Sequence, residues 1–329
     1  MARPPGQLIA DLTQLGGAGA VVVELSAGEP VPQAGSGAVL IGLHRSGGLP
    51  ATDLDPFDIL LSADPAAPRP WVGIAPNRLE ATLGALLAAI AAQPVAAAVA
   101  AQVLRASLAL TFDQALAIES GAYSMLLASD GFKAWRAGRP VRSRLDAGEP
   151  RVLIEPDRAM LRLRLNRPEV RNAFDAAMRD ALCDALRFAA EHPDQPAVEL
   201  SGVGPAFSAG GDLDEFGSAG DVGEAHLIRT LRSPAGLLHR LRDRATARLH
   251  GACVGAGIEV PAAAGRVTAA AGAFFRLPEV SMGLIPGAGG TASIPRRIGR
   301  RRAAYMAISG ADIDVNTALA WELIDAVKT

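Results

Sequence analysis

The sequence predicts an α/β protein of two domains, in which sheets are layered with surrounding helices. Its length of 329 residues is long for one small domain and comfortable for two. Half of the residues are apolar, so a sizeable core can form. Strand-like and helix-like patterns alternate through the second half of the chain, which is typical of helices packed on sheets.

The N-terminal part predicts a smaller α/β domain that ends in helices. Residues 1 to about 80 hold three β-like runs, AVVVEL, AVLIGL and FDILLS, between Gly- and Pro-rich connections. Residues 78–137 turn helical, and apolar side chains recur at helical spacing within the segment 112–127. A charged segment with Pro and Gly at 136–150 sets the boundary. We therefore expect an N-terminal domain at 1–148 and a core domain at 149–329.

The core domain opens with a predicted hairpin followed by a helix. In the second strand Leu161, Leu163 and Leu165 alternate with arginines, which indicates a half-buried strand. Asn172 is the expected N-cap of the next helix, and Asp175 is placed to pair with a residue four positions later. Further strands are expected at 197–202 and 245–251, and helices at 222–242 and 258–265.

Bulk composition excludes several classes of partner. A net charge of −2 gives no reason to expect nucleic acid or an acidic membrane surface. Cys183 and Cys253 are too few for a disulfide scaffold and indicate a reducing, cytoplasmic location. Residues 1–14 lack an apolar signal-peptide region. The apolar run 83–104 is broken by Pro94, so a buried helix pair explains it better than a membrane span.

Three glycine clusters stand out: FSAGGDL at 207–213, HGACVGAGIE at 250–259 and FRLPEVSMGLIPGAGG at 275–290. None carries the Lys-Ser/Thr of a phosphate loop or the spacing of a dinucleotide site. Turns are the simplest interpretation. Glycines can also let peptide N–H groups approach a substrate carbonyl, where one donor is worth about 3 kcal/mol of barrier. Gly211, after a strand, and Ala256, at a predicted helix start, could supply two such donors.

Two carboxylates lie beside these clusters in otherwise apolar sequence. Glu259 alone could be a first-turn helix residue, and Glu279 alone could be a solvated surface residue. Together, desolvation should raise the pKa of both, which suits general acid or base catalysis near neutral pH. The five histidines are scattered without metal-ligand spacing, so no metal is expected.

Four segments, in this order and spacing, resemble the enoyl-CoA hydratase/isomerase (crotonase) superfamily over residues 150–327: LNRPEVRNAF, GPAFSAGGDLDEF, HGACVGAGIE and FRLPEVSMGLIPGAGGTASIPRRIG. The resemblance implies a crotonase-like core of repeated ββα units that binds acyl-CoA thioesters. It also implies an oxyanion hole from the N–H groups of Gly211 and Ala256, with Glu259 and Glu279 acting on water and the α-carbon.

The same resemblance implies contacts to CoA, no separate cofactor because CoA is part of the substrate, and a trimeric or hexameric homo-oligomer. The implied CoA contacts are Val170, Arg171, Ala209 and Leu213.

Two departures and one rearrangement accompany this resemblance. Ala256 stands where the family has glycine, although its N–H remains available. Pro261 lies one turn beyond Gly257, where its ring would crowd a carbonyl unless the helix begins late. Residues 80–137 resemble the helical tail that follows the core in the family, here placed before it. We expect the N-terminal domain to be a degenerate, non-catalytic crotonase-like half that caps the core or supplies an oligomer contact.

The leading hypothesis is therefore an enoyl-CoA hydratase-like lyase of the kind used in fatty acid metabolism. Alternatives on the same fold are double-bond isomerisation, which usually needs only the second glutamate, and cofactor-independent oxygenation of an arylacetyl-CoA. A third alternative is a non-catalytic crotonase-like subunit, which would bind acyl-CoA without turnover.

Overall fold

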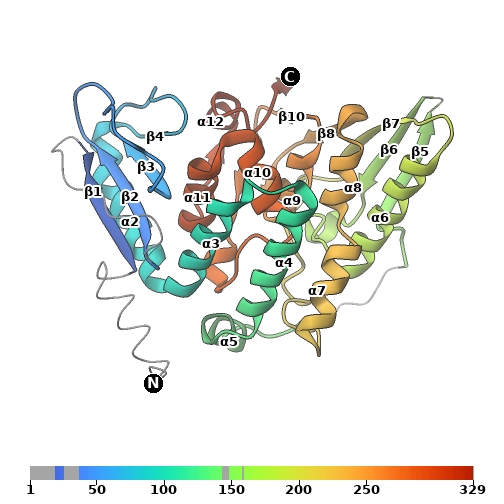
Figure 1. Cartoon of the computed structure of the whole chain (residues 1–329). Coiled ribbons are helices and arrows are strands. Elements are labelled where there is room, and N and C mark those ends of the chain that lie inside the picture. Colours follow the sequence, from blue (N-terminus) through green and yellow to red (C-terminus); the bar gives the residue numbers. More distant parts are fainter. Residues whose placement is uncertain (1–18, 26–36, 143–147, 158, 329) are drawn as a thin grey trace.

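A computed structural model describes residues 19–25, 37–142, 148–157 and 159–328 (Figure 1). The expectation about a signal peptide falls on residues 1–14, which lie outside the described part. Residues 143–147, in the middle of the predicted boundary segment, also lie outside the described part.

A four-stranded parallel sheet forms one end of the molecule (Figure 1). Its strands follow chain order: β1 (Ala20–Glu24), β2 (Val39–His44), β3 (Ile59–Ser62) and β4 (Val72–Gly73). The residues of β2 and β3 are buried throughout, as expected for a sheet covered on both faces. The three predicted N-terminal strands are confirmed.

Helices follow this sheet, as predicted. They are α2 (Leu79–Ala92), preceded by a 3-10 turn at Pro76–Arg78, then α3 (Pro94–Ser107), α4 (Phe112–Leu127) and α5 (Asp130–Ala137). Pro94 is the first residue of α3, where its missing N–H costs nothing. No single helix among the described residues is long and apolar enough to cross a membrane. The segments Pro76–Ala92 and Pro94–Ser107 meet these criteria only when they are taken together, and they are bent by 105° relative to each other.

A six-stranded sheet lies at the other end of the molecule (Figure 1). Its order is β13 (Ala326–Lys328), β10 (Arg266–Ala270), β8 (Ala245–Leu249), β7 (Ala197–Gly202), β6 (Met160–Leu165) and β5 (Val152–Asp157). Strands β5 and β6 form the predicted antiparallel hairpin, and every other pair is parallel. Leu161, Leu163 and Leu165 are buried, which confirms the alternation expected for β6.

Repeated ββα units build the core. In two of these units, which begin at β8 and β10, the first strand joins the large sheet and the second joins a small sheet of order β12–β11–β9, whereas β5 and β6 both belong to the large sheet. The remaining elements are β9 (Ala252–Val254), β11 (Phe274–Arg276), β12 (Ile313–Asp314), α6 (Ala176–Glu191), α7 (Val222–Leu231), α8 (Pro234–Arg240), α9 (Ala256–Glu259), α10 (Gly290–Ile298), α11 (Arg300–Ser309) and α12 (Val315–Ala320). Short 3-10 turns lie at Pro168–Val170, Arg242–Arg244, Pro261–Ala263 and Glu279–Met282. The crotonase-like α/β class is thus present.

The helices α2 to α5 pack on this core. Helix α3 contacts α10 and α11, and α4 contacts α7 and α10; in Figure 1 α4 lies between α10 and α7. One cluster of buried apolar residues runs from Ala20 to Ile324 and so includes both predicted domains. The division at 148/149 and the degenerate origin of the first half stay predictions.

Two local predictions were wrong. Asn172 has a left-handed backbone (φ 54°) and its side chain binds the backbone of Arg167, Val203 and Ala206. The N-cap of α6 is Asp175 instead, because its carboxylate accepts the Met178 N–H at 2.7 Å. That carboxylate also pairs with Arg151 and Arg167, not with the residue four positions later.

The predicted helix at 258–265 is also interrupted. Helix α9 is a single turn that ends at Glu259, and Pro261 begins the following 3-10 turn. Pro261 therefore sits at a helix start rather than inside a helix, so its ring meets no hydrogen-bonded carbonyl.

Candidate active site

Strand pairing brings the two predicted glutamates together. Strands β9 and β11 are parallel neighbours, with Val254 opposite Arg276 at their ends. The chain therefore leaves both strands at the same edge of the small sheet. Glu259 ends the first turn after β9, and Glu279 begins the turn after β11. This register explains how residues twenty positions apart in sequence share one site.

The two predicted oxyanion donors lie on adjacent loops. Ser208 pairs with Cys253 in a parallel bridge, which places the loop after β7 beside the loop after β9. Gly211 and Ala256 both line one cavity of about 310 Å³. Within the described ranges, neither peptide N–H donates a hydrogen bond to the protein. Two donors free of protein partners and facing one cavity can receive a developing negative charge.

Glu259 is buried and hydrogen-bonded. Its Oε2 accepts the N–H groups of Ala288 at 2.7 Å and Gly290 at 3.0 Å. Gly290 begins α10, so the carboxylate faces the positive end of a helix. Burial, and next the negative charges of Glu279 and Glu119, raise the pKa of Glu259 well above its ordinary value; the two N–H donors oppose this shift.

Glu279 is also buried, but its carboxylate has fewer hydrogen-bond partners among the described residues than that of Glu259. Its Oε2 has no hydrogen-bond partner among the described residues, and desolvation raises the pKa of this carboxyl to about 8. Gly255 makes room for it: its φ is +50°, and a Cβ there would lie 2.4 Å from Glu279 Oε1. Glycine is required here by both the backbone angle and the space.

Helix α4 supplies a third buried carboxylate, Glu119, which sequence reasoning missed. Its Oε1 accepts the Gly289 N–H, and its Oε2 accepts the N–H and Oγ1 of Thr291, all at 2.7 Å. Burial raises the pKa of Glu119 to about 7, although these hydrogen bonds lower it. An acidic residue in the middle of a helix with an apolar stripe was the only signal in the sequence. Glu119 thus ties α4 to the turn that also holds Glu259.

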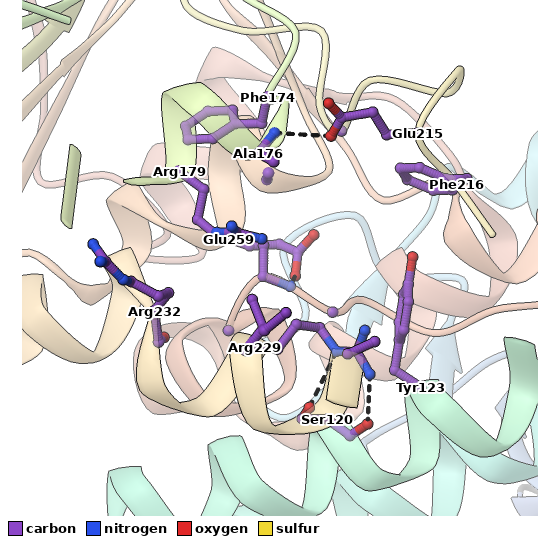
Figure 2. Close-up of a pocket in the computed structure, with 18 of the residues that line it drawn as sticks. Ser120, Tyr123, Phe174, Ala176, Arg179, Glu215, Phe216, Arg229, Arg232 and Glu259 are labelled. Atoms are coloured by element: carbon purple, nitrogen blue, oxygen red, sulfur yellow. Dashed lines mark hydrogen bonds between the residues drawn. The ribbon is translucent and has the colours of Figure 1, made fainter. Parts of the chain in front are cut away.

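The N-terminal helices form part of the cavity wall. Tyr123 on α4 packs its ring against Gly287, where a Cβ would lie 2.4 Å from the ring. Sequence reasoning placed Tyr123 on the apolar face of its helix but gave it no role. Figure 2 shows the Tyr123 ring beside Arg229 of α7, with Glu259 and Phe174 across the cavity.

The residues predicted to contact CoA lie outside the cavity wall in the described part of the chain. Arg171 and Ala209 are joined, because the Ala209 N–H donates to the Arg171 carbonyl at 2.8 Å. Val170 precedes them in its 3-10 turn, and Leu213 is exposed between the lining residues Asp212 and Glu215. The first three are therefore neighbours, and Leu213 lies at the rim.

Over the described residues, no group of three or more His, Cys, Asp or Glu side chains is arranged to hold a metal ion. Of the four glutamates that line the cavity, three accept backbone N–H groups, and the fourth, Glu279, has an oxygen without a hydrogen-bond partner among the described residues.

Comparisons with known proteins agree with this geometry. The family model described as enoyl-CoA hydratase/isomerase matches residues 155–329. The chain is 31% identical over 180 residues to a mevalonyl-coenzyme A hydratase of Beauveria bassiana, covering 52% of this chain and 64% of the relative. It is 32% identical over 171 residues to the 2,3-dehydroadipyl-CoA hydratase of Escherichia coli, covering 51% and 65%. The chain thus spans slightly less than two thirds of the length of these relatives.

A solved structure shows the same fold. The enoyl-CoA hydratase of Thermoplasma volcanium has a TM-score of 0.51 and 32% sequence identity, with 56% of this chain and 74% of that chain covered.

Proposed function

Since the chain belongs to the enoyl-CoA hydratase/isomerase family, we propose that it adds water across the double bond of a 2-enoyl-CoA thioester. One observation carries the proposal. Two buried carboxylates, Glu259 and Glu279, line the same cavity as the Gly211 and Ala256 peptides, whose N–H groups have no hydrogen-bond partner in the part of the chain that the structure describes. The printed names of two relatives, hydratases of mevalonyl-CoA and dehydroadipyl-CoA, support the same reaction class.

The free N–H groups explain how the double bond is activated. The thioester oxygen accepts from Gly211 and Ala256, and attack of water at the β-carbon moves an electron pair onto that oxygen as an enolate. Ala256 begins α9, so its N–H is one of those that no helical carbonyl can accept. Preorganised donors of this kind are worth about 3 kcal/mol each.

The two glutamates divide the proton transfers. Glu259 takes a proton from water: burial and the neighbouring carboxylates raise its pKa, but the Ala288 and Gly290 N–H groups favour the ionised form that acts as the base. Glu279 gives a proton to the α-carbon, because its pKa of about 8 keeps it protonated at neutral pH. The two negative charges repel each other in a low dielectric, so the pair holds one proton. After water addition Glu259 carries the proton and Glu279 is ionised. Proton exchange between the two carboxyls then restores the starting state.

Purified protein with crotonyl-CoA tests the proposal. Loss of the enoyl thioester absorbance and formation of 3-hydroxybutyryl-CoA are the expected results. Glu259→Gln should lower kcat by about 10²- to 10⁴-fold while the protein stays folded, because the Gln carbonyl can still accept from the two N–H groups. Glu191→Gln, an exposed position on α6, is the matched control. Full activity in Glu259→Gln would overturn the assigned role.

Double-bond isomerisation is a second candidate, favoured by the difference between the two glutamates. Oε2 of Glu259 is occupied by two donors, whereas Oε2 of Glu279 is free within the described part of the chain. A single mobile carboxyl suffices to move a proton from the α- to the γ-carbon. Incubation with a 3-enoyl-CoA decides: a rise in conjugated enoyl absorbance that survives Glu259→Gln identifies an isomerase.

Cellular location, assembly and CoA contacts stay predictions. The two cysteines are buried and free, which supports a reducing, cytoplasmic location. Analytical ultracentrifugation would test the expected trimer or hexamer. Binding of the CoA moiety near Val170, Arg171, Ala209 and Leu213 can be tested by titrating CoA against variants of Arg171.

A further inference from the structure

Arg229 on α7 is a partly buried cation in the cavity wall with neutral partners. Its Nε donates to Ser120 Oγ at 3.1 Å, and its Nη2 donates to the Ser120 carbonyl at 3.3 Å and to Ser124 Oγ. Its guanidinium lies over the Tyr123 ring, 4.8 Å from the centroid. Figure 2 shows this guanidinium held along one edge by Ser120.

The positive charge of Arg229 makes no direct ion pair among the described residues, and the carboxylate of Glu119 acts on it only at longer range. Across the described residues, no carboxylate comes within ion-pair distance of it, and its Nη1 makes no hydrogen bond. Desolvation lowers the pKa of Arg229 below its ordinary value. The other two arginines of the wall differ, because Arg179 pairs with Asp180, and Arg232 pairs with Asp184. A partly buried charge without a partner costs free energy unless a ligand supplies the opposite charge.

The position of Arg229 relates it to the reacting atoms. The Tyr123 ring packs on Gly287, in the turn whose N–H groups hold Glu259, and the Arg229 guanidinium lies over this ring. The cavity between them is mainly apolar, with Leu116, Ala225 and Ile228 among its lining residues. An acyl chain whose thioester reaches Gly211 and Ala256 can thus extend along this wall and end near the guanidinium.

We propose that Arg229 binds a carboxylate at the far end of the acyl group, so that the substrates are CoA monothioesters of unsaturated dicarboxylic acids. The proposal rests on the proposed function, since it requires an acyl-CoA in this cavity. A planar guanidinium in the cavity wall, whose Nη1 makes no hydrogen bond among the described residues, matches a carboxylate better than a neutral methyl end, and a bound carboxylate gives it a direct ion pair.

A matched substrate pair tests this. 2-Hexenoyl-CoA and 2-hexenedioyl-CoA have the same number of acyl carbons and differ in the terminal carboxylate. We expect kcat/KM of the wild type to be about 10- to 100-fold higher for the dicarboxylic substrate, the range for hydrogen bonds to a charged group. In Arg229→Gln this ratio should fall close to one, through KM more than kcat. Arg229→Lys should recover part of it, because the charge remains without the planar fork.

Arg240→Gln is the matched control, since Arg240 also bridges to α4, through Asp113, but is exposed outside the cavity. Its substrate ratio should equal that of the wild type. Calorimetric binding of the saturated thioesters adipoyl-CoA and hexanoyl-CoA adds a readout that needs no turnover. One result separates the two proposals: neither unsaturated substrate reacts, but adipoyl-CoA binds more tightly than hexanoyl-CoA, and Arg229→Gln removes this difference. The proposed hydratase activity would then be wrong, while the recognition of a terminal carboxylate by Arg229 would be supported.

Two outcomes would overturn the proposal. One is equal binding of adipoyl-CoA and hexanoyl-CoA by the wild type. The other is an equal loss for both thioesters in Arg229→Gln, which would assign Arg229 to the CoA phosphates or to the packing of α4 on α7.

Discussion

Replacing Glu279 by Gln should make the protein more stable at alkaline pH while removing activity. Burial raises the pKa of Glu279 to about 8 in the folded protein, and the ordinary value of 4.5 applies to the unfolded chain. Between these pH values the folded state holds a proton that the unfolded state has released. The contribution of this group is therefore fully present below pH 4.5 and is lost as the pH rises through 8.

The magnitude follows from the same shift. A change from 4.5 to about 8, at about 1.4 kcal/mol per pH unit, corresponds to roughly 5 kcal/mol above pH 8. The amide of Gln would place an N–H₂ where Oε2 has no partner, which costs about 2 kcal/mol. Glu279→Gln should therefore gain about 3 kcal/mol in free energy of unfolding at pH 8.5 and lose about 1 kcal/mol at pH 5, where only about 1 kcal/mol of the shift has developed.

Urea unfolding at pH 5 and pH 8.5 measures both values, with Glu191→Gln as the exposed control. The control should show the same pH dependence as the wild type. Hydratase activity of Glu279→Gln should fall by at least about 100-fold. A wild type that becomes more stable from pH 5 to pH 8.5, or a Glu279→Gln variant that is destabilised equally at both, would refute this reasoning.

Two further substitutions test residues that surround Glu259 and Glu279. Glu119→Ala removes the acceptor of three hydrogen bonds to Gly289 and Thr291, so the free energy of unfolding should fall by about 2–5 kcal/mol; urea unfolding checks this, and an unchanged midpoint would contradict it. Gly255→Ala would put a methyl group 2.4 Å from Glu279 Oε1 at a φ of +50°. We expect at least a 100-fold loss in kcat for crotonyl-CoA with a smaller change in KM, and near-normal kcat would show that the carboxylate has room to move.

Most of the core could be predicted because its signals are local. The alternating leucines of β6 predicted which face of this strand is buried, and the glycine clusters indicated places where backbone segments approach closely. Gly255 illustrates this, because only glycine fits its positive φ beside Glu279. The N-cap of α6 could not be chosen from sequence, since Asn172 and Asp175 are both good capping residues. The choice depends on Arg151 and Arg167, which pair with Asp175 from other elements.

The contacts that distant elements make around the cavity were harder to predict from the sequence. Glu119 and Thr291 are 172 positions apart and meet only because α4 packs on α10. Nothing near Glu119 distinguishes it from a surface residue of an amphipathic helix. The same holds for Arg229, whose neutral surroundings are created by serines of a different helix.

The sequence by itself determined the alternation of strands and helices and the glycine turns, because period and steric need act within a few residues; the ββα units and the pairing of Glu259 with Glu279 were implied by the resemblance of four segments to a known family. The tertiary structure decided which N–H groups hold Glu259, that the N-terminal helices form part of the cavity wall, and that Arg229 lines the cavity without a direct ion pair among the described residues. These depend on how apolar faces from distant segments are buried against each other. Burial in turn raises the pKa of Glu259 and Glu279.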